Sequence, residues 1–125
     1  MTKQKTILIV DDDERNIFAL EAVLRSRGFE TSTAANGELA LETLTSRPNI
    51  DLVLMDIMMP IMDGYEAMRA IRDNKSIKNI PVIALTAKAM KGDKLKCLEA
   101  GANDYCAKPV DIIELFNKIE NCLKE

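Results

Sequence analysis

The sequence predicts an α/β protein with a doubly wound sheet of five parallel strands and five helices. Short, unbroken apolar runs, such as residues 7–10, alternate with segments whose apolar residues recur every three or four positions. Each run stops abruptly at a charged or polar residue, which is typical of a strand buried on both faces. The chain has 125 residues, enough for one hydrophobic core, so we expect a single domain over 1–125.

The first half of the chain contains two strand–helix pairs. Residues 7–10 (ILIV) form the first expected strand, and apolar residues have helical spacing from 14 to about 27. Gly28 suits the left-handed position that often ends a helix. A second strand is expected over 30–34, where threonines alternate, and the Asn36-Gly37 turn begins the second helix.

The same alternation continues in the second half. Asp111 can cap the last expected helix, with Glu114 three residues later, and that helix carries the clearest apolar stripe. Leu95 and Leu98 indicate the helix before it, which Gly101 ends. The remaining elements of this half are expected as strands over 52–55, 82–85 and 104–107, and as a helix over about 64–73.

Composition excludes several classes of function. The chain has no histidine, so a Ser–His–Asp or Cys–His nucleophile and a histidine-containing zinc site cannot form. A formal net charge of −3 argues against direct nucleic-acid binding. No apolar run approaches the roughly 18 residues that span a bilayer, so we expect no membrane association. Three cysteines without a CxxC pair indicate reduced thiols and a cytoplasmic location.

Charge is unevenly spread along the chain. Residues 1–64 carry 6 basic and 11 acidic side chains, whereas residues 65–125 carry 11 basic and 9 acidic ones. Four lysines cluster around the fourth expected helix. This cluster is either a solvated face or a binding patch, and the pattern favours the solvated face. Its four lysines are Lys88, Lys91, Lys94 and Lys96.

Reactive side chains stand where the expected strands end. Asp11 and Asp12 come after the first strand, Asp56 after the third, Thr86 after the fourth and Lys108 after the fifth. Because ligands of doubly wound sheets bind beyond the carboxyl ends of the strands, we expect one shared site. Clustered carboxylates repel unless a cation lies among them, and Mg²⁺ or Mn²⁺ prefers such oxygen ligands. The set suits phosphoryl transfer, with one aspartate as the nucleophile.

Each of these residues also has a purely structural explanation. Asp11 and Asp12 can belong to an acidic helix start, which the helix dipole favours. Asp56 and Thr86 can serve as turn or cap residues, and Lys108 can be a solvated loop lysine. It is their coincidence at one edge of the sheet that favours a functional site.

Four segments of the chain together resemble a known family. They are ILIVDDD (7–13), LVLMDIMMPIMDG (52–64), VIALTA (82–87) and AKP (107–109). Their combination resembles the receiver (CheY-like) domain of two-component response regulators, most of all the receivers of hybrid histidine kinases. The resemblance covers essentially the whole chain and implies a flavodoxin-like sheet with strand order 2-1-3-4-5.

The resemblance implies a role for each residue of the acidic site. Asp56 would be the phosphoacceptor nucleophile. Asp12 and Asp56 would bind Mg²⁺ directly, and Asp11 would bind it through water. The backbone carbonyl of Met58 would complete the protein ligands, and Lys108 would contact a phosphoryl oxygen.

The resemblance also implies a switch. Thr86 and the backbone N–H of Ala87 would bind the remaining phosphoryl oxygens, and Tyr105 would move inward as Thr86 turns toward the phosphoryl group. The Lys108–Pro109 peptide bond would be cis. Lys88 would flank, together with the residue two positions after the phosphoacceptor, the approach of a hydrolytic water.

The function that follows is that of a signalling switch. A histidine kinase or a histidine phosphotransfer protein would supply phosphohistidine, and a downstream target would bind the face of the fourth helix, fifth strand and fifth helix. The protein would then not be an enzyme beyond its own phosphorylation and dephosphorylation. The alternative is a Mg²⁺-dependent phosphohydrolase that works through an aspartyl phosphate. Such an enzyme needs a second acid or base beside the nucleophile, and Met58 occupies that position here.

Overall fold

Five strands and five helices alternate along the chain, in the predicted order and close to the predicted bounds. The computed structural model describes residues 4–47, 49–87 and 91–124, with the side chain of residue 91 excepted. The strands are β1 (Thr6–Val10), β2 (Glu30–Ala34), β3 (Leu52–Asp56), β4 (Val82–Thr86) and β5 (Asp104–Ala107). The helices are α1 (Glu14–Ser26), α2 (Gly37–Ser46), α3 (Gly64–Asp73), α4 (Lys91–Ala100) and α5 (Ile112–Leu123).

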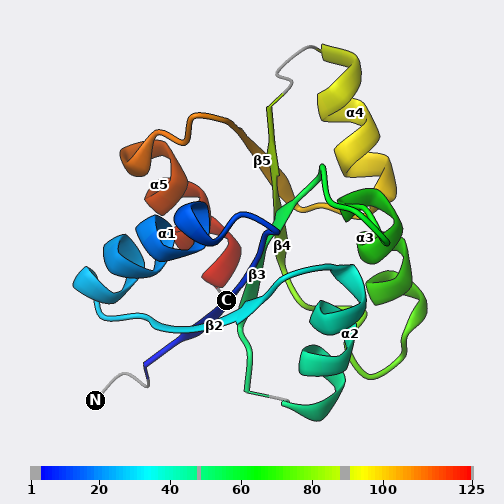
Figure 1. Ribbon diagram of the computed structural model, residues 1–125, viewed down its shortest axis with the longest axis horizontal. Coiled ribbons are helices and arrows are strands. Elements are labelled where there is room, and N and C mark those ends of the chain that lie inside the picture. The colour runs from blue at the N-terminus through cyan, green and yellow to red at the C-terminus, as the bar shows by residue number, and fades with distance from the viewer. Residues whose placement is uncertain (1–3, 48, 88–90, 125) are drawn as a thin grey trace.

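The strands form one parallel sheet in the order β2-β1-β3-β4-β5, which confirms the order implied by the resemblance. Figure 1 shows α1 and α5 on one face of this sheet and α2, α3 and α4 on the other. Both faces of β1, β3 and β4 are therefore covered, which is why these strands consist almost entirely of apolar residues.

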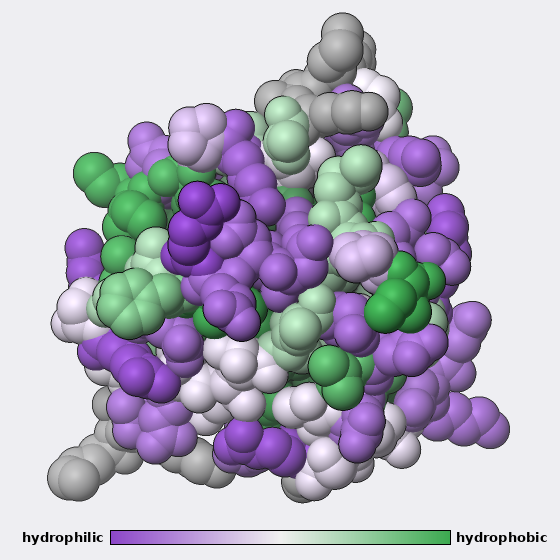
Figure 2. All heavy atoms as spheres, in the orientation of Figure 1, coloured by the Kyte–Doolittle hydropathy of each residue, from purple (hydrophilic) through white to green (hydrophobic). Residues whose placement is uncertain are grey.

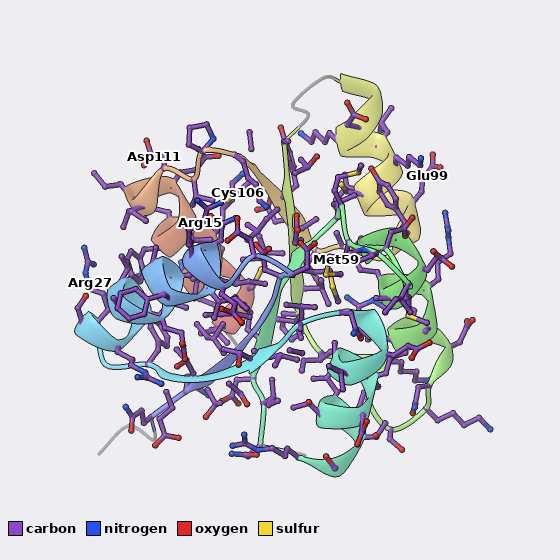
Figure 3. All side chains as sticks on the ribbon, viewed as in Figure 1. Arg15, Arg27, Met59, Glu99, Cys106 and Asp111 are labelled. Atoms are coloured by element: carbon purple, nitrogen blue, oxygen red, sulfur yellow. The ribbon has the colours of Figure 1, made fainter. Side chains whose placement is uncertain are left out.

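Alternate residues of the central strands contribute to two separate cores. Ile9 and Leu54 pack with α1 and α5, whereas Leu8 and Val53 pack with α2, α3 and α4. Side chains fill the space between helices and sheet on both sides, as Figure 3 shows. The two cores hold the central strands rigidly, and these strands in turn position the residues at their carboxyl ends.

Local sequence signals determine where the helices begin and end. Asp13, Asn36, Asp63 and Asp111 each precede a helix, and each side chain accepts a hydrogen bond from a backbone N–H of its first turn. Gly28 has a positive φ of 89°, as the sequence predicted for the end of the first helix. The predicted cap at Asp111 is also confirmed.

Helix α4 differs from the other helices in what it buries. Among its described side chains, Cys97 and Ala100 are buried, whereas Leu95 and Leu98 are 52% and 37% exposed. The leucine spacing therefore indicated a helix correctly, but the leucines are not the residues that pack on the sheet.

All three cysteines are free thiols, as expected. None of the described helices is both long and apolar enough to cross a membrane.

Candidate functional site

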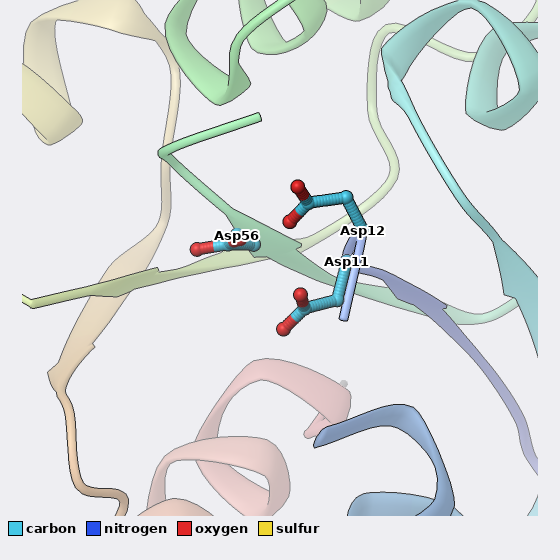
Figure 4. Close-up of side chains that lie close together, drawn as sticks. All are labelled: Asp11, Asp12 and Asp56. Atoms are coloured by element: carbon cyan, nitrogen blue, oxygen red, sulfur yellow. The ribbon is translucent and has the colours of Figure 1, made fainter. Parts of the chain in front are cut away.

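Three carboxylates come together beyond the carboxyl ends of β1 and β3. Asp11 and Asp12 follow β1, and Asp56 is the last residue of β3. One oxygen from each carboxylate lies within 4.8 Å of the other two. Figure 4 shows all three groups turned toward the same side. The parallel register of β1 and β3 brings them together, because Val10 pairs with Met55 directly before the two acidic ends.

The three aspartates differ in their exposure. Asp11 and Asp56 are 1% and 4% exposed, whereas Asp12 faces solvent. Asp11 is held in place by the backbone N–H of Asp13, which donates to its Oδ1 at 2.9 Å, and by a longer contact of 3.5 Å from Asn16 Nδ2. The site therefore has two fixed carboxylates below and one accessible carboxylate at its mouth.

Lys108 supplies the positive charge of the cluster. Its Nζ lies 2.9 Å from Asp56 Oδ1 and 3.5 Å from Asp11 Oδ2. The backbone N–H of Lys108 donates to the carbonyl of Thr86 at 2.7 Å, and the following Lys108–Pro109 peptide bond is cis. Burial opposes the charge of Lys108, but its hydrogen bond to Asp56 and the charges of both buried aspartates outweigh that effect and raise its pKa.

Asp56 lies in an environment that disfavours its negative charge. Burial raises the pKa of Asp56, the charge of Asp11 adds to that rise, and the hydrogen bond from Lys108 opposes it. Among the described residues, three carboxylates thus face one ammonium group. A divalent cation would complete the charge balance, and an all-oxygen donor set is the one that Mg²⁺ prefers over soft metals. The chemistry of the described donors therefore fits Mg²⁺.

Thr86 and Tyr105 occupy neighbouring strands on the same side of the sheet. Thr86 is the last residue of β4 and is 3% exposed. Tyr105 pairs with Ala84, two residues before Thr86, and both Ala84 and Tyr105 belong to the core under α2, α3 and α4. Because side chains two apart in a strand share a face, Thr86 and Tyr105 do so as well.

The other residues implied by the resemblance lie around this edge. Ala87 directly follows β4 and is exposed. Met58, two residues after Asp56, exposes 66% of its surface, and its backbone N–H donates to the Asp56 carboxylate. Lys88 lies outside the described residues.

Sequence reasoning missed one residue that positions the site and described another only in part. Asn16 was not singled out, although its place in the first turn of α1, five residues after Asp11, is a signal that could have found it. Gly64 begins α3 against the end of β3, and a Cβ there would lie 2.5 Å from the carbonyl oxygen of Asp56. The close approach of α3 to the site therefore requires glycine.

Comparison with known proteins agrees with this arrangement. The family model for the response regulator receiver domain matches residues 7–120. The chain belongs to this family. Response regulator PleD of Caulobacter vibrioides is 41% identical over 115 residues, which span 92% of this chain and 25% of PleD.

Solved structures of receivers superpose closely on this one. A putative response regulator from Chloroflexus aurantiacus has a TM-score of 0.92 and 40% identity over 97% of this chain and 98% of that one. The receiver domain of sensor histidine kinase PA1611 from Pseudomonas aeruginosa has a TM-score of 0.87 and 40% identity over 97% of this chain and 98% of its own. That structure holds a magnesium ion in its active site cleft.

Proposed function

We propose that this receiver domain takes a phosphoryl group from a phosphohistidine onto Asp56 in a Mg²⁺-dependent reaction. The phosphodonor is a histidine kinase or a histidine phosphotransfer protein. One observation carries the proposal: the buried Asp56 carboxylate lies among two further carboxylates, with Lys108 Nζ only 2.9 Å from its Oδ1. Magnesium in the cleft of the PA1611 receiver supports the same reading.

The residues of the site divide the chemistry among them. An Asp56 oxygen forms the new bond to phosphorus while the bond between phosphorus and the imidazole nitrogen breaks. Asp12 and Asp56 bind Mg²⁺ directly, Asp11 binds it through water, and the carbonyl of Met58 is a further ligand. Bound Mg²⁺, or Mn²⁺ in its place, neutralises charge on the phosphoryl oxygens.

Lys108, Thr86 and Ala87 bind the transferred group. Lys108 moves its hydrogen bond from the Asp56 carboxylate to a phosphoryl oxygen, which leaves its charge paired. The Thr86 hydroxyl and the backbone N–H of Ala87 donate to the other oxygens. Thr86 shares a sheet face with Tyr105, so its movement is transmitted to the surface formed by α4, β5 and α5, where a downstream target binds.

In this proposal the protein is a cytoplasmic switch. It acts without direct nucleic-acid binding, and it catalyses only its own phosphorylation and dephosphorylation. The phosphohydrolase alternative is less well supported. The side chain two residues after Asp56 is Met58, which can neither donate nor accept a proton in catalysis.

Labelling with a small phosphodonor tests the proposal. Incubation with acetyl phosphate and Mg²⁺ should add one phosphoryl group, measured by intact-mass spectrometry, and chelation should prevent it. Asp56→Asn should not be labelled, because the amide is not a nucleophile. Asp12→Ala should lose Mg²⁺ affinity by about tenfold or more, because a direct ligand is removed.

Asp13→Asn is the matched control. It changes a neighbouring acidic residue outside the cluster and retains a side chain able to cap α1. It should be labelled like the wild type. Labelling of Asp56→Asn at the wild-type rate would refute the assignment of the phosphoacceptor.

A further inference from the structure

The ring of Tyr105 is contacted by lysines from two different helices. Tyr105 is half-buried in the edge strand β5, which lies beside α4 and α5. The ammonium group of Lys118, in α5, lies 4.7 Å from the centre of the ring, and that of Lys94, in α4, lies 5.4 Å from it. Both distances are within the range of cation–π attraction. Because Figure 1 shows α4 and α5 on opposite faces of the sheet, the two contacts come from helices on both faces.

Lys118 is fixed by more than the ring. Its side chain is 19% exposed, and its Nζ lies 2.9 Å from a carboxylate oxygen of Glu114 and 3.6 Å from one of Asp104. The same ammonium group donates a hydrogen bond to the backbone carbonyl of Tyr105. Lys118 therefore contacts both the backbone and the ring of Tyr105 from a position that two acidic side chains hold.

Lys94 joins α4 to the same ring. Among the described side chains of α4, only Cys97 and Ala100 are buried, and hydrophilic side chains predominate on the right of the view in Figure 2, where α3 and α4 lie. Contacts of exposed side chains therefore contribute to the attachment of this helix. Lys96 makes a contact of the same kind elsewhere, because its Nζ lies 4.5 Å from the centre of the Tyr65 ring in α3.

The contacts of Lys94 and Lys118 belong to the conformation described above. The proposed switch, on which this inference rests, moves the ring of Tyr105 inward as Thr86 turns toward a phosphoryl group. That movement takes the ring away from both ammonium groups, because Lys118 remains paired with Glu114 and Lys94 remains on α4. A contact that is made in only one of two conformations shifts the equilibrium toward that conformation.

We propose that Lys94 and Lys118 are positioning residues that hold Tyr105 in its resting position and so oppose the switch. By linkage, a group that favours the resting conformation weakens the binding of a ligand that favours the switched one. Each ammonium group should therefore weaken the binding of a phosphoryl analogue by about two- to fivefold, which is the effect of a cation–π contact at an exposed site. The two lysines determine how readily the protein switches, whereas the acidic cluster performs the reaction.

Binding of beryllofluoride tests this role. Beryllofluoride is a phosphoryl analogue that binds a carboxylate in the presence of Mg²⁺, and the NMR shifts of amides near Asp56 would give its Kd. Lys94→Met and Lys118→Met keep an unbranched side chain and remove the ammonium group. Each should lower the Kd by about two- to fivefold, and the double variant should lower it further. Loss of a positive charge by itself would weaken the binding of an anion, so tighter binding reports the lost ring contact.

Matched variants separate the ring contact from general effects. Lys96→Met removes the same charge from α4, together with the contact to Tyr65, and should leave the Kd unchanged. Lys118→Arg keeps a cation that can lie over the ring and should bind beryllofluoride like the wild type. In a Tyr105→Leu background, adding Lys94→Met or Lys118→Met should have no further effect on the Kd.

Three results would overturn the positioning role. The first is a wild type that binds beryllofluoride and is labelled by acetyl phosphate, while Lys94→Met and Lys118→Met keep the wild-type Kd; the phosphoacceptor proposal would then stand alone. The second is an equal effect of these substitutions with and without Tyr105. The third is a wild type that neither binds beryllofluoride nor accepts a phosphoryl group, in which case the phosphoacceptor proposal fails and this inference fails with it.

Discussion

At the scale of single residues, the described part of the site holds more negative than positive charge. Lys108 contacts Asp56 and Asp11, but Asp12 has no ammonium partner among the described ion pairs. Leaving carboxylates so close together costs stability unless a cation joins them. The same imbalance makes the cluster receptive to a divalent cation.

Met58 should prolong the lifetime of a phosphoryl group on Asp56. The thioether cannot donate a hydrogen bond and accepts only weakly, so it orients an attacking water poorly. Met58→Asn supplies a donor and an acceptor at this exposed position and should speed hydrolysis. When Lys88→Glu is added, at a position outside the described residues, we expect hydrolysis to become about tenfold faster. That change corresponds to an activation barrier lower by about 1.4 kcal/mol. Decay of labelled protein in Mg²⁺ buffer measures this, and an unchanged or slower decay would contradict it.

Ile61 stores backbone strain in the loop between β3 and α3. Its φ is 71°, a left-handed conformation that a β-branched residue adopts unfavourably, and its side chain is 74% exposed. Ile61→Asn should stabilise the fold by about 1 kcal/mol, because Asn tolerates this conformation and no buried contact is lost. Urea unfolding measures the change. Ile113→Asn, at a similarly exposed position of α5, should give no gain, and a loss of stability in Ile61→Asn would disprove the explanation.

At the scale of elements, hydrogen bonds from one arginine side chain connect α3 to neighbouring segments. Arg72, near the end of α3, donates to the carbonyl of Gly101 at 2.9 and 2.7 Å, to that of Ile80 at 2.7 Å and to Asn103 Oδ1 at 2.8 Å. Burial lowers the pKa of this guanidinium. Gly101 allows the approach, because a Cβ there would lie 2.7 Å from Arg72 Cγ. The carboxyl end of α4 is thereby tied to α3 and β5.

The close packing of α3 against the end of β3 requires glycine at Gly64. A Cβ at this position would lie 2.5 Å from the Asp56 carbonyl and 2.7 Å from Ile57 Cα, and backbone atoms cannot yield cheaply. Gly64→Ala should cost about 2 kcal/mol or more in the free energy of unfolding and should slow labelling of Asp56. Gly92→Ala in α4 is the control. Its Cβ meets nothing within 4 Å, so it should be neutral or stabilising, and equal effects of both variants would contradict the packing argument.

At the scale of the whole molecule, two cores enclose the sheet and exclude water from the one thiol that the sheet contains. Cys106 of β5 is 2% exposed, in the core with α1 and α5, and Figure 3 labels it beside α5. Burial raises the pKa of Cys106 from 9.0 to about 11. The unfolded chain therefore loses this proton before the folded protein does, and stability falls as pH rises through that interval.

Alkaline unfolding should reveal this linkage. Between pH 9 and 11, the free energy of unfolding of the wild type should fall relative to that of Cys106→Ala. The limiting slope is about 1.4 kcal/mol per pH unit for one group. Cys106→Ala costs stability near neutrality through lost packing, so the two curves should converge as pH rises. Parallel curves over this interval would show that the thiol does not ionise differently in the two states.

Much of the fold was determined by the sequence alone. The abrupt ends of the apolar runs identified β1, β3 and β4 to within one residue, because a strand buried on both faces has no polar positions in its interior. The predicted cap at Asp111 located a helix start, since its hydrogen bond involves only the next turn. The expectation that the reactive residues lie at one edge of the sheet followed from the common direction of the strands in a parallel sheet.

Only the tertiary structure decided which side chains meet and which remain uncovered. The 2.9 Å contact between Lys108 and Asp56 joins residues 52 positions apart, and no local pattern specifies a distance across a sheet. The exposure of Leu95 and Leu98 was likewise undetermined, because helical spacing defines a stripe but not the surface that it faces. Cys97 and Ala100 let α4 lie close to the sheet, which turns its leucines outward. The sequence determined local conformation and chemistry, whereas packing between distant elements decided geometry and exposure.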